Sequence, residues 1–401
     1  MGCDDAGIVR SGKTVSGKLV DESGFPVGGV RVKIGDNETQ SGSDGSFVLN
    51  EITYPYNLKV LMLGSPNRAY YYENLNLTQP IVTLFGTEGS HYNAEVTVTI
   101  PPMSGQERAY VIFSDLNKVQ SDAVIVQPNT SVNFTVRWKG NEQLSGKVMV
   151  LVVNYISGAV INYEKYGEKS VSITANSSNT VSFYAPDLSF NPGEINVSGN
   201  LIIPAGALSP RIDLQLNFKQ GGSLISPFTS GTTVSYINGT NFSLILPADI
   251  SPMPRFVFGG SALGSNIYEF TTGTLVYSQP VTVVSIDLNS FPVLISPAHS
   301  ASDVTYSTLF RISLSGGNFA FVYTFDGNDR VFYLVTMSTE VRIPDFRDMG
   351  FGIASSHSYE WWVNGYGDIT STDEFLGYDI HSNNSLKKYI SSTQRSFSTS
   401  P

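Results

Sequence analysis

The sequence predicts an all-β protein of about four β-sandwich domains that follow one another in an elongated array. The composition favours this class, because only 14% of the residues are charged while Gly, Ser, Thr, Asn, Val and Tyr are abundant. Short stretches of alternating apolar and polar residues recur along the whole chain, separated by Gly, Pro, Asn and Asp. The length of 401 residues suits three or four domains of ordinary size.

Residues 1–12 are predicted to be a flexible tether that carries a lipid on Cys3. Cys3 is the only cysteine, which excludes a disulfide framework and a cysteine-based zinc site. The start Met1-Gly2-Cys3-Asp4-Asp5 resembles the mature start of bacterial lipoproteins, and its acidic residues resemble the surface-export signals of Bacteroidota-type lipoproteins. The resemblance implies a lipoprotein of the bacterial outer membrane, exposed on the cell surface. The alternative is an incidental thiol in an unstructured end.

Residues 13–87 are predicted to form the first sandwich, with Asp44-Gly45 as a tight hairpin that holds Gly45 at positive φ. Alternation predicts strands over residues 14–21, 31–34, 46–49 and 56–60. The segment resembles the carboxypeptidase regulatory-like domain, a transthyretin-like β-sandwich, which implies an accessory or surface module without catalytic activity. The matching residues are Val15, Gly17, Val20, Asp21, Gly24, Pro26, Val30, Val32, Asp44, Gly45, Phe47 and Leu58.

Two further sandwiches are predicted over residues 88–190 and 191–289. The continuous apolar run Val148–Val153 indicates a fully buried strand. The second block reads as a possible diverged repeat of the first. The pairs of stretches that match are 94–100 with 195–203, 108–112 with 211–216, 163–167 with 268–273, and 179–188 with 280–288.

Residues 290–401 are predicted to form a fourth sandwich, and a long insertion is expected near 368–392, with one helical turn at Leu386–Ile390. Strands are expected over residues 320–325, 331–336, 358–363 and 394–399. The segment resembles a fibronectin type III-like or immunoglobulin-like domain, with Tyr359 near the start of the penultimate strand. The resemblance implies a fold and no particular activity.

The sequence contains no recognisable catalytic, cofactor-binding or metal-binding motif. The adjacent carboxylates Asp373 and Glu374 suit a solvated loop better than glycoside hydrolysis. Asp326, Asn328 and Asp329 offer oxygen ligands for calcium, but turn chemistry already explains them. We therefore expect no enzyme activity, no cofactor and no metal.

Aromatic residues are the candidates for ligand binding. In the strand that contains Trp362, Tyr359 and Trp361 share one face, so Trp362 points the other way and could stack on a sugar ring or on another protein. The alternative is that the insertion folds over Trp362. Tyr70 and Tyr72 are candidates for the same reason, because the Tyr70–Tyr72 run cannot lie entirely within a core; partial burial against the second domain is the alternative.

These observations predict a non-catalytic cell-surface lipoprotein that acts in adhesion, in presentation or as a structural module of the bacterial envelope. One alternative is a carbohydrate-binding accessory lipoprotein for glycan uptake, and another is a subunit of an extracellular filament or surface layer. The expected partners are a membrane, through Cys3, and glycans or other surface proteins. The net charge of −10 argues against nucleic acid. Ligand contact is expected at the C-terminal end, as the part farthest from the anchor.

Overall fold

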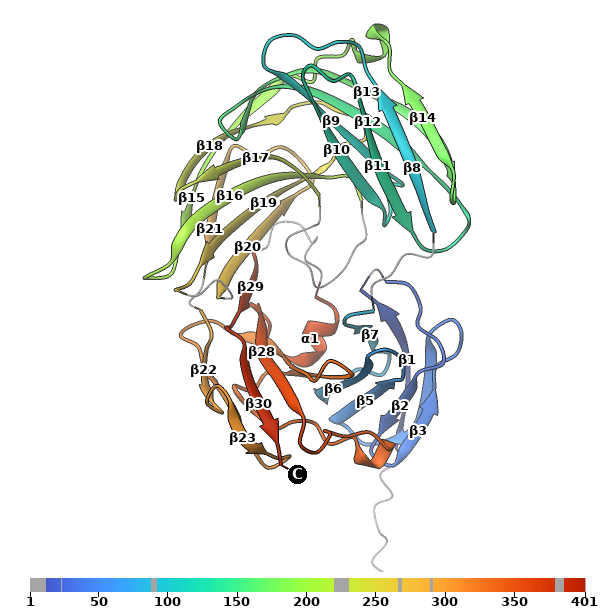
Figure 1. Cartoon of the computed structure of the whole chain (residues 1–401), viewed down its shortest axis with the longest axis vertical. Helices are drawn as coiled ribbons and strands as arrows, with labels where there is room; N and C mark the ends of the chain where they lie inside the picture. The colour runs from blue at the N-terminus through green and yellow to red at the C-terminus, as the bar shows by residue number, and fades with distance from the viewer. Residues whose placement is uncertain are drawn as a thin grey trace, which may run out of the picture.

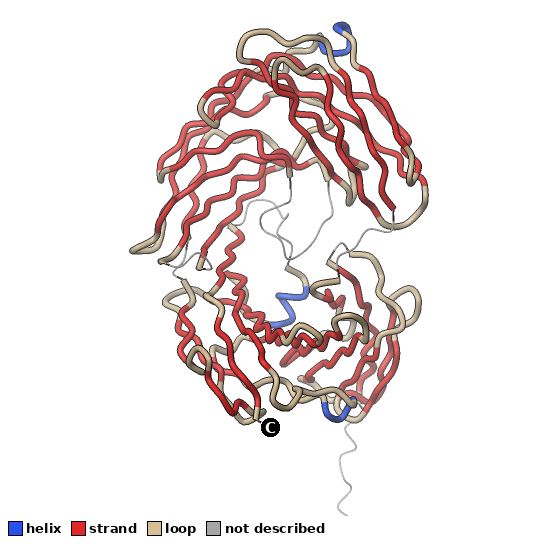
Figure 2. The backbone as a smooth tube through the Cα atoms, in the orientation of Figure 1, coloured by secondary structure: helices blue, strands red, loops and turns tan. Residues whose placement is uncertain are grey.

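The computed structural model describes residues 12–22, 24–87, 92–219, 231–265, 269–288, 291–378 and 386–400. Within these residues the chain forms strands β1 to β30, one short helix, α1 (Thr372–Leu376), and two 3-10 turns, η1 (Ala185–Leu188) and η2 (Arg347–Met349). Strands therefore make up nearly all of the regular structure (Figure 2). The predicted all-β fold of several sandwich domains is confirmed.

The first sandwich packs a three-stranded sheet against one end of a much longer sheet. The small sheet has the order β4-β1-β7, and the long sheet contributes β6, β5, β2 and β3. Alternation decides which side faces inwards, because Val15 and Leu19 are buried between the sheets while Ser16 and Lys18 face solvent. The strands are β1 (Lys13–Asp21), β2 (Arg31–Ile34), β3 (Asn37–Gln40), β4 (Ser46–Ile52), β5 (Tyr56–Met62), β6 (Asn67–Leu75) and β7 (Ile81–Leu84).

The turn at Asp44-Gly45 differs in one respect from the prediction. Gly45 has a φ of +78°, as predicted. However, the turn does not join the two strands of a hairpin, because it leads from β3, which pairs with β2, to β4, which pairs with β1. The chain therefore crosses from one sheet to the other here, close to the backbone of β1. A Cβ atom at Gly45 would lie 2.3 Å from the carbonyl oxygen of Leu19.

The second and third sandwiches have the same strand order. Sheet β10-β9-β12-β13 faces β11-β8-β14 in the second, and β17-β16-β19-β20 faces β18-β15-β21 in the third. A Cβ atom at Gly167 would lie 3.0 Å from Leu188 Cδ2, and one at the equivalent Gly273 would lie 2.8 Å from Leu288 Cδ2. The two sandwiches therefore share their strand order and this glycine contact, and the diverged repeat itself stays a prediction. The strands are β8 (Tyr92–Thr99), β9 (Glu107–Ser114), β10 (Gln120–Val126), β11 (Ser131–Trp138), β12 (Gln143–Ile156), β13 (Ala159–Thr174), β14 (Ser178–Ser182), β15 (Glu194–Ile202), β16 (Leu208–Asn217), β17 (Thr232–Asn238), β18 (Asn241–Pro247), β19 (Arg255–Leu263), β20 (Phe270–Tyr277) and β21 (Val283–Asp287).

The apolar run Val148–Val153 in β12 is buried throughout, because alternate side chains face two different cores. One core belongs to the second sandwich, and the other is shared with the third. Tyr110 and Tyr163 extend this contact, since their hydroxyls donate to the carbonyl oxygens of Val234 (2.8 Å) and Ile245 (3.2 Å). These acceptors lie on β17 and β18, which are edge strands of the two sheets of the third sandwich. The second sandwich therefore covers the side of the third sandwich where these two edges lie.

The fourth sandwich packs the sheet β22-β24-β27 against β25, β26, β28 and β30 of the long sheet. Tyr359, Trp361 and Val363 are buried between these sheets, as their alternation predicts. The last predicted strand is also present, as β30. The strands are β22 (Val293–Ser296), β23 (Ala301–Val304), β24 (Phe310–Ser313), β25 (Phe319–Asp326), β26 (Arg330–Thr336), β27 (Glu340–Val341), β28 (Ser358–Gly367) and β30 (Arg395–Thr399).

Two strand pairings link the third, fourth and first sandwiches. The second sandwich contacts the third through a shared core and the first through the Lys139–Asp21 ion pair, so the contacts form a closed cycle. β26 pairs in parallel with β6 of the first sandwich, with Arg330 opposite Asn67, and β20 of the third sandwich pairs with β29 (Lys387–Ser391). One sheet therefore runs from β17 to β3 through the third, fourth and first sandwiches. The expected elongated array is wrong in this respect, because the first and last sandwiches lie side by side (Figure 1). Alternation along a strand does not reveal which strand edges meet.

The insertion near 368–392 contributes to two of these contacts. On α1, Phe375 lies in a core shared with the first sandwich, and Asp373 accepts a hydrogen bond from the backbone N–H of Asn76 (2.9 Å). β29 lies between β20 and β28 in the long sheet. The predicted helical turn at Leu386–Ile390 is wrong, because most of this stretch belongs to β29, which hydrogen-bonds to a strand on each side.

Asp348 makes a charged connection between the fourth and first sandwiches. Its carboxylate oxygens lie 2.9 Å from Lys33 Nζ and 2.8 Å from Lys59 Nζ. Partial burial acts to raise the pKa of Asp348, but hydrogen bonds from Lys59 and Lys33 outweigh it and hold the pKa below its usual value. Because the folded pKa is depressed, this contribution to stability is fully present above about pH 5 and is lost as the pH falls below about 4.

We therefore expect Asp348→Asn to lower the midpoint of thermal unfolding by about 1–3 °C at pH 7. The difference from the wild type should shrink as the pH falls through the lowered pKa of Asp348. Asp345→Asn is the matched control, because Asp345 pairs with Arg347 of its own loop. Thermal scans between pH 3 and pH 7 check this expectation. Equal effects of the two substitutions, or a difference that does not shrink as the pH falls, would contradict it.

Candidate ligand-binding site

Tyr70 and Tyr72 are fully buried, so their predicted role in ligand binding is wrong. Their side chains point from β6 towards β7 across the core of the first sandwich. The hydroxyl of Tyr72 donates to the carbonyl oxygen of Thr83 (2.5 Å), and that of Tyr70 donates to the carbonyl oxygen of Phe85 (2.6 Å). Tyr71 points the other way and is half-buried. The two tyrosines therefore fasten one sheet to the other.

Trp362 is half-buried on the face of β28 opposite Trp361. The same face carries Tyr366, whose ring contacts Phe375 of α1 with a centroid separation of 5.2 Å. The insertion therefore covers this face at Tyr366, while Trp362 lies nearer the other end of the strand. A binding role for Trp362 stays a prediction. Cys3, the predicted lipid attachment point, lies outside the described residues.

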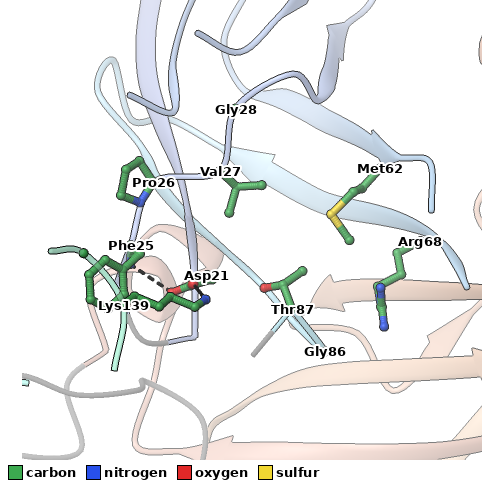
Figure 3. Close-up of a pocket in the computed structure, with 11 residues that line it drawn as sticks. Asp21, Phe25, Pro26, Val27, Gly28, Met62, Arg68, Gly86, Thr87 and Lys139 are labelled. Carbon is green, nitrogen blue, oxygen red and sulfur yellow. Dashed lines mark hydrogen bonds and ion pairs between the residues drawn. The ribbon is translucent and has the colours of Figure 1, made fainter. Parts of the chain in front are cut away.

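A pocket of about 610 Å³ lies where the first sandwich meets the second (Figure 3). Its walls come from the end of β1 and the loop after it, from facing ends of β5 and β6, from the end of β7 and from the loop after β11. In Figure 3, Asp21, Phe25 and Lys139 lie on one side, while Met62 and Arg68 lie on the other. The residues that line it are Asp21, Phe25, Pro26, Val27, Gly28, Met62, Arg68, Gly86, Thr87, Lys139 and Gly140.

Arg68 reaches the pocket because it continues the row of Tyr72 and Tyr70 along β6. Successive members of this row are two residues apart and share one face of the strand. Tyr72 and Tyr70 meet Thr83 and Phe85, so the next position meets Gly86, which lies just after the end of β7. At this position the strand face is no longer in the core, and its side chain is the half-buried Arg68 instead of a buried tyrosine.

The guanidinium of Arg68 has no carboxylate within 4 Å among the described residues. The carbonyl oxygen of Pro66 lies 3.4 Å from Nη1 of Arg68. The hydroxyl of Tyr333 lies beside it, and burial raises the pKa of Tyr333 to about 12, so this hydroxyl stays neutral at physiological pH. Arg68 is therefore a half-buried cation without a direct carboxylate partner among the described residues, while the carboxylate of Glu22, bound to the backbone N–H of Gly86, adds a negative charge nearby.

The opposite side of the pocket holds an ion pair between Lys139 and Asp21. Both side chains are nearly excluded from solvent, with 9% and 3% of their surfaces exposed. Asp21 also accepts a hydrogen bond from the backbone N–H of Phe25 (2.9 Å), which fixes the loop after β1. Lys118 Nζ lies 4.6 Å from the centroid of the Phe25 ring and Lys139 Nζ lies 5.7 Å from it. On this side Asp21 therefore balances the charge of Lys139, while Lys118, which does not line the pocket, adds a further cation.

The floor of the pocket is shaped by Gly86, which has a φ of +68°. A Cβ atom there would lie 3.1 Å from Arg68 Nε and 3.0 Å from the hydroxyl of Tyr333. The backbone N–H of Gly86 donates to the carboxylate of Glu22 (2.6 Å). Among the described residues, no group of three potential metal-ligating side chains occurs.

Sequence reasoning missed this site. The spacing of Arg68 from Tyr70 and Tyr72 is a detectable signal, because it places a charged residue on the face of a tyrosine row. Lys139 lies 118 residues from Asp21, and nothing in the sequence indicates that they meet. No described helix is both long and apolar enough to cross a membrane.

Comparisons with known proteins find weak structural similarities. No protein-family model and no curated protein matches the sequence. A leucine-rich repeat protein from Bacteroides thetaiotaomicron is similar over 49% of this chain, at 8% identity and a TM-score of 0.18, and the match spans 26% of that protein's length. A Ca2+-stabilised adhesin of an Antarctic bacterium that binds ice is similar over 97% of this chain and 98% of its own, at 10% identity and a TM-score of 0.16. Fibronectin domains 1–3 of chicken CNTN1 are similar over 59% of this chain and 82% of their own, at 13% identity and a TM-score of 0.14. At these TM-scores the similarities carry no conclusion about function.

Proposed function

We propose that this protein is a non-catalytic adhesion or presentation module of the bacterial cell surface, held to the outer membrane by a lipid on Cys3. The observation that carries the proposal is the closed cycle of contacts between the four sandwiches. Strand pairing from β17 to β3 and the shared cores connect the sandwiches into one body. Such a body suits the display of a binding surface at a fixed distance from a membrane.

The positions of the chain ends change the expected direction of display. β1 begins, and β30 ends, in the half of the molecule formed by the first and fourth sandwiches (Figure 1). An anchor at Cys3 would hold this half towards the membrane. The second and third sandwiches would then lie farthest from it, rather than the C-terminal domain as the order of the sequence suggests.

The anchor is tested on the native protein. In the full-length precursor, Cys3→Ser should abolish acylation and release the protein from the membrane fraction, because stable attachment requires at least two acyl chains or an equivalent second signal. Mass spectrometry of the mature wild-type protein should find Cys3 as an acylated first residue. An unmodified Cys3 would overturn the anchor.

The adhesion role is tested with the soluble body, residues 12–400, coupled to beads and presented to a panel of immobilised glycans and host or bacterial surface proteins. Saturable capture on at least one class of surface is expected, without chemical change of the captured partner. Uncoupled beads and beads coated with heat-unfolded body are the controls. Hydrolysis of a glycan or peptide by the body, abolished by substituting a carboxylate or a histidine, would overturn the non-catalytic proposal.

A second candidate, a carbohydrate-binding accessory lipoprotein, is favoured by the pocket between the first and second sandwiches. Its volume of about 610 Å³ falls within the range of small-molecule sites and suits one or two sugar units. Both candidates are binding proteins, and the pocket is compatible with either.

A further inference from the structure

We propose that the pocket between the first and second sandwiches binds a carboxylated sugar, such as a hexuronic acid unit of a glycan, with Arg68 holding the carboxylate. The inference deepens the proposed binding function and rests on it. Its basis is the distribution of charge around the pocket, the apolar wall beside Arg68 and the way Arg68 is held.

Of the two cations that line the pocket, Lys139 and Arg68, only Lys139 is paired with a carboxylate among the described residues. Lys139 is neutralised by Asp21, and the carboxylate of Glu22 is engaged by the backbone N–H of Gly86. Arg68 has no carboxylate within 4 Å among the described residues. The planar guanidinium matches a carboxylate through two parallel hydrogen bonds. The carboxylate of Glu22 already accepts the hydrogen bond of the Gly86 N–H, and it adds a negative charge near the ligand. The site therefore favours a singly charged anion over a phosphate dianion.

The wall next to Arg68 is apolar. Met62 lies directly opposite Arg68 in the antiparallel pairing of β5 and β6, and Val27 faces the same space (Figure 3). A pyranose ring carries C–H groups that pack against such a wall and hydroxyl groups that need polar partners. Thr87 and the Lys139–Asp21 pair supply polar groups across the pocket. A carboxylated sugar matches all three kinds of surface at once, whereas an acidic peptide side chain has no hydroxyl groups to bond across the pocket.

The backbone of Arg68 is placed by the two sheets. It is paired on both sides, with Met62 of β5 and with Val331 of β26. Gly86 leaves room for the side chain, since a Cβ atom there would approach Arg68 Nε to 3.1 Å. Strand pairing and this space therefore let the guanidinium reach the pocket.

The test is isothermal titration calorimetry of the whole chain with D-glucuronate and with D-glucose, which differ only in the carboxylate at C6. We expect binding of D-glucuronate, and binding of D-glucose that is weaker by about tenfold or more. Arg68→Gln should weaken D-glucuronate binding by about the same factor and leave the response to D-glucose unchanged. Arg68→Lys should restore part of the affinity, because it keeps the charge and loses the paired hydrogen bonds.

Arg137→Gln is the matched control, because Arg137 is an exposed arginine on β11, two residues before Lys139 and outside the pocket. It should bind D-glucuronate like the wild type. Near-ultraviolet circular dichroism of each variant establishes that it is folded. A second titration uses N-acetyl-glutamic acid α-amide, which presents a carboxylate without a sugar ring, and it should bind at least about tenfold more weakly than D-glucuronate.

Several results would overturn this inference. They are equal binding of D-glucuronate and D-glucose, no binding of either, binding that survives Arg68→Gln, and equal binding of the glutamate derivative, which would indicate a peptide ligand. Each of these leaves the adhesion role intact if the coated beads still capture a surface. Conversely, loss of bead capture with retained D-glucuronate binding would remove the adhesion role and keep the site.

Discussion

Replacing Lys139 with methionine is expected to lower the free energy of unfolding by about 3–5 kcal/mol. Methionine preserves the apolar part of the side chain but leaves Asp21 as a buried carboxylate, 3% exposed, without its cation. Loss of the cation is costly, because the hydrogen bonds that Asp21 keeps do not replace the counter-charge that compensates for its desolvation. The midpoint of urea unfolding, followed by fluorescence, measures the loss.

Two further variants identify the cause. Adding Asp21→Asn to Lys139→Met should recover most of the loss, because asparagine keeps an oxygen for the backbone N–H of Phe25 and carries no charge. Lys118→Met is the matched control, since Lys118 also lies over the Phe25 ring but belongs to no ion pair among the described residues. If Lys118→Met is as damaging as Lys139→Met, the buried charge is not the reason. Failure of the double variant to recover would point to the same conclusion.

Replacing Gly45 with valine should cost about 2–5 kcal/mol. Part of this cost is the left-handed backbone conformation, which is worth about 1–2 kcal/mol for a residue with a Cβ atom. The rest is a collision, because a Cβ atom at Gly45 would lie 2.3 Å from the carbonyl oxygen of Leu19 and 3.3 Å from the backbone nitrogen of Val27. Both obstacles are backbone atoms of the first sandwich, which cannot turn aside as a flexible side chain can.

Gly35→Val separates the two contributions. Gly35 has a φ of +57°, but a Cβ atom there would have no other atom within 4 Å. The control should therefore show only the conformational cost, and the difference between the two variants measures the collision. Thermal unfolding of both proteins at the same pH provides the comparison. Equal stability of the two variants would mean that the turn shifts without cost.

The sequence predicts the strands well because alternation depends only on neighbouring residues. Val15 and Leu19 face a core, and the run Val148–Val153 is buried on both faces, as their patterns indicate. The pairing of β6 with β26 could not be predicted in this way, because any strand edge offers the same backbone groups. The burial of Tyr70 and Tyr72 has a related cause. Their hydroxyls find acceptors on a strand whose position only the packed sandwich defines.

The candidate site could not be predicted from the sequence either, because it depends on contacts between distant segments. Arg68 belongs to a row that is visible in the sequence, but its significance depends on which charges surround it. Asp21 and Lys139 come from different sandwiches, and their meeting neutralises a cation that would otherwise compete for the same ligand. Local patterns identify single strands and turns, whereas a site at a junction depends on contacts between distant segments.

The pairing of β6 with β26 also has a consequence for synthesis. A growing chain is made from the N-terminus, so Asn67 cannot pair until Arg330 has been added about 260 residues later. At about 5–20 residues per second, the partner strand appears roughly 15–50 s after β6. During that interval β6 has a bare edge, and the aromatic surface that later covers Tyr70 has not been made. A holding chaperone, or passage through the membrane in an unfolded state, would protect this strand until the last quarter of the chain arrives.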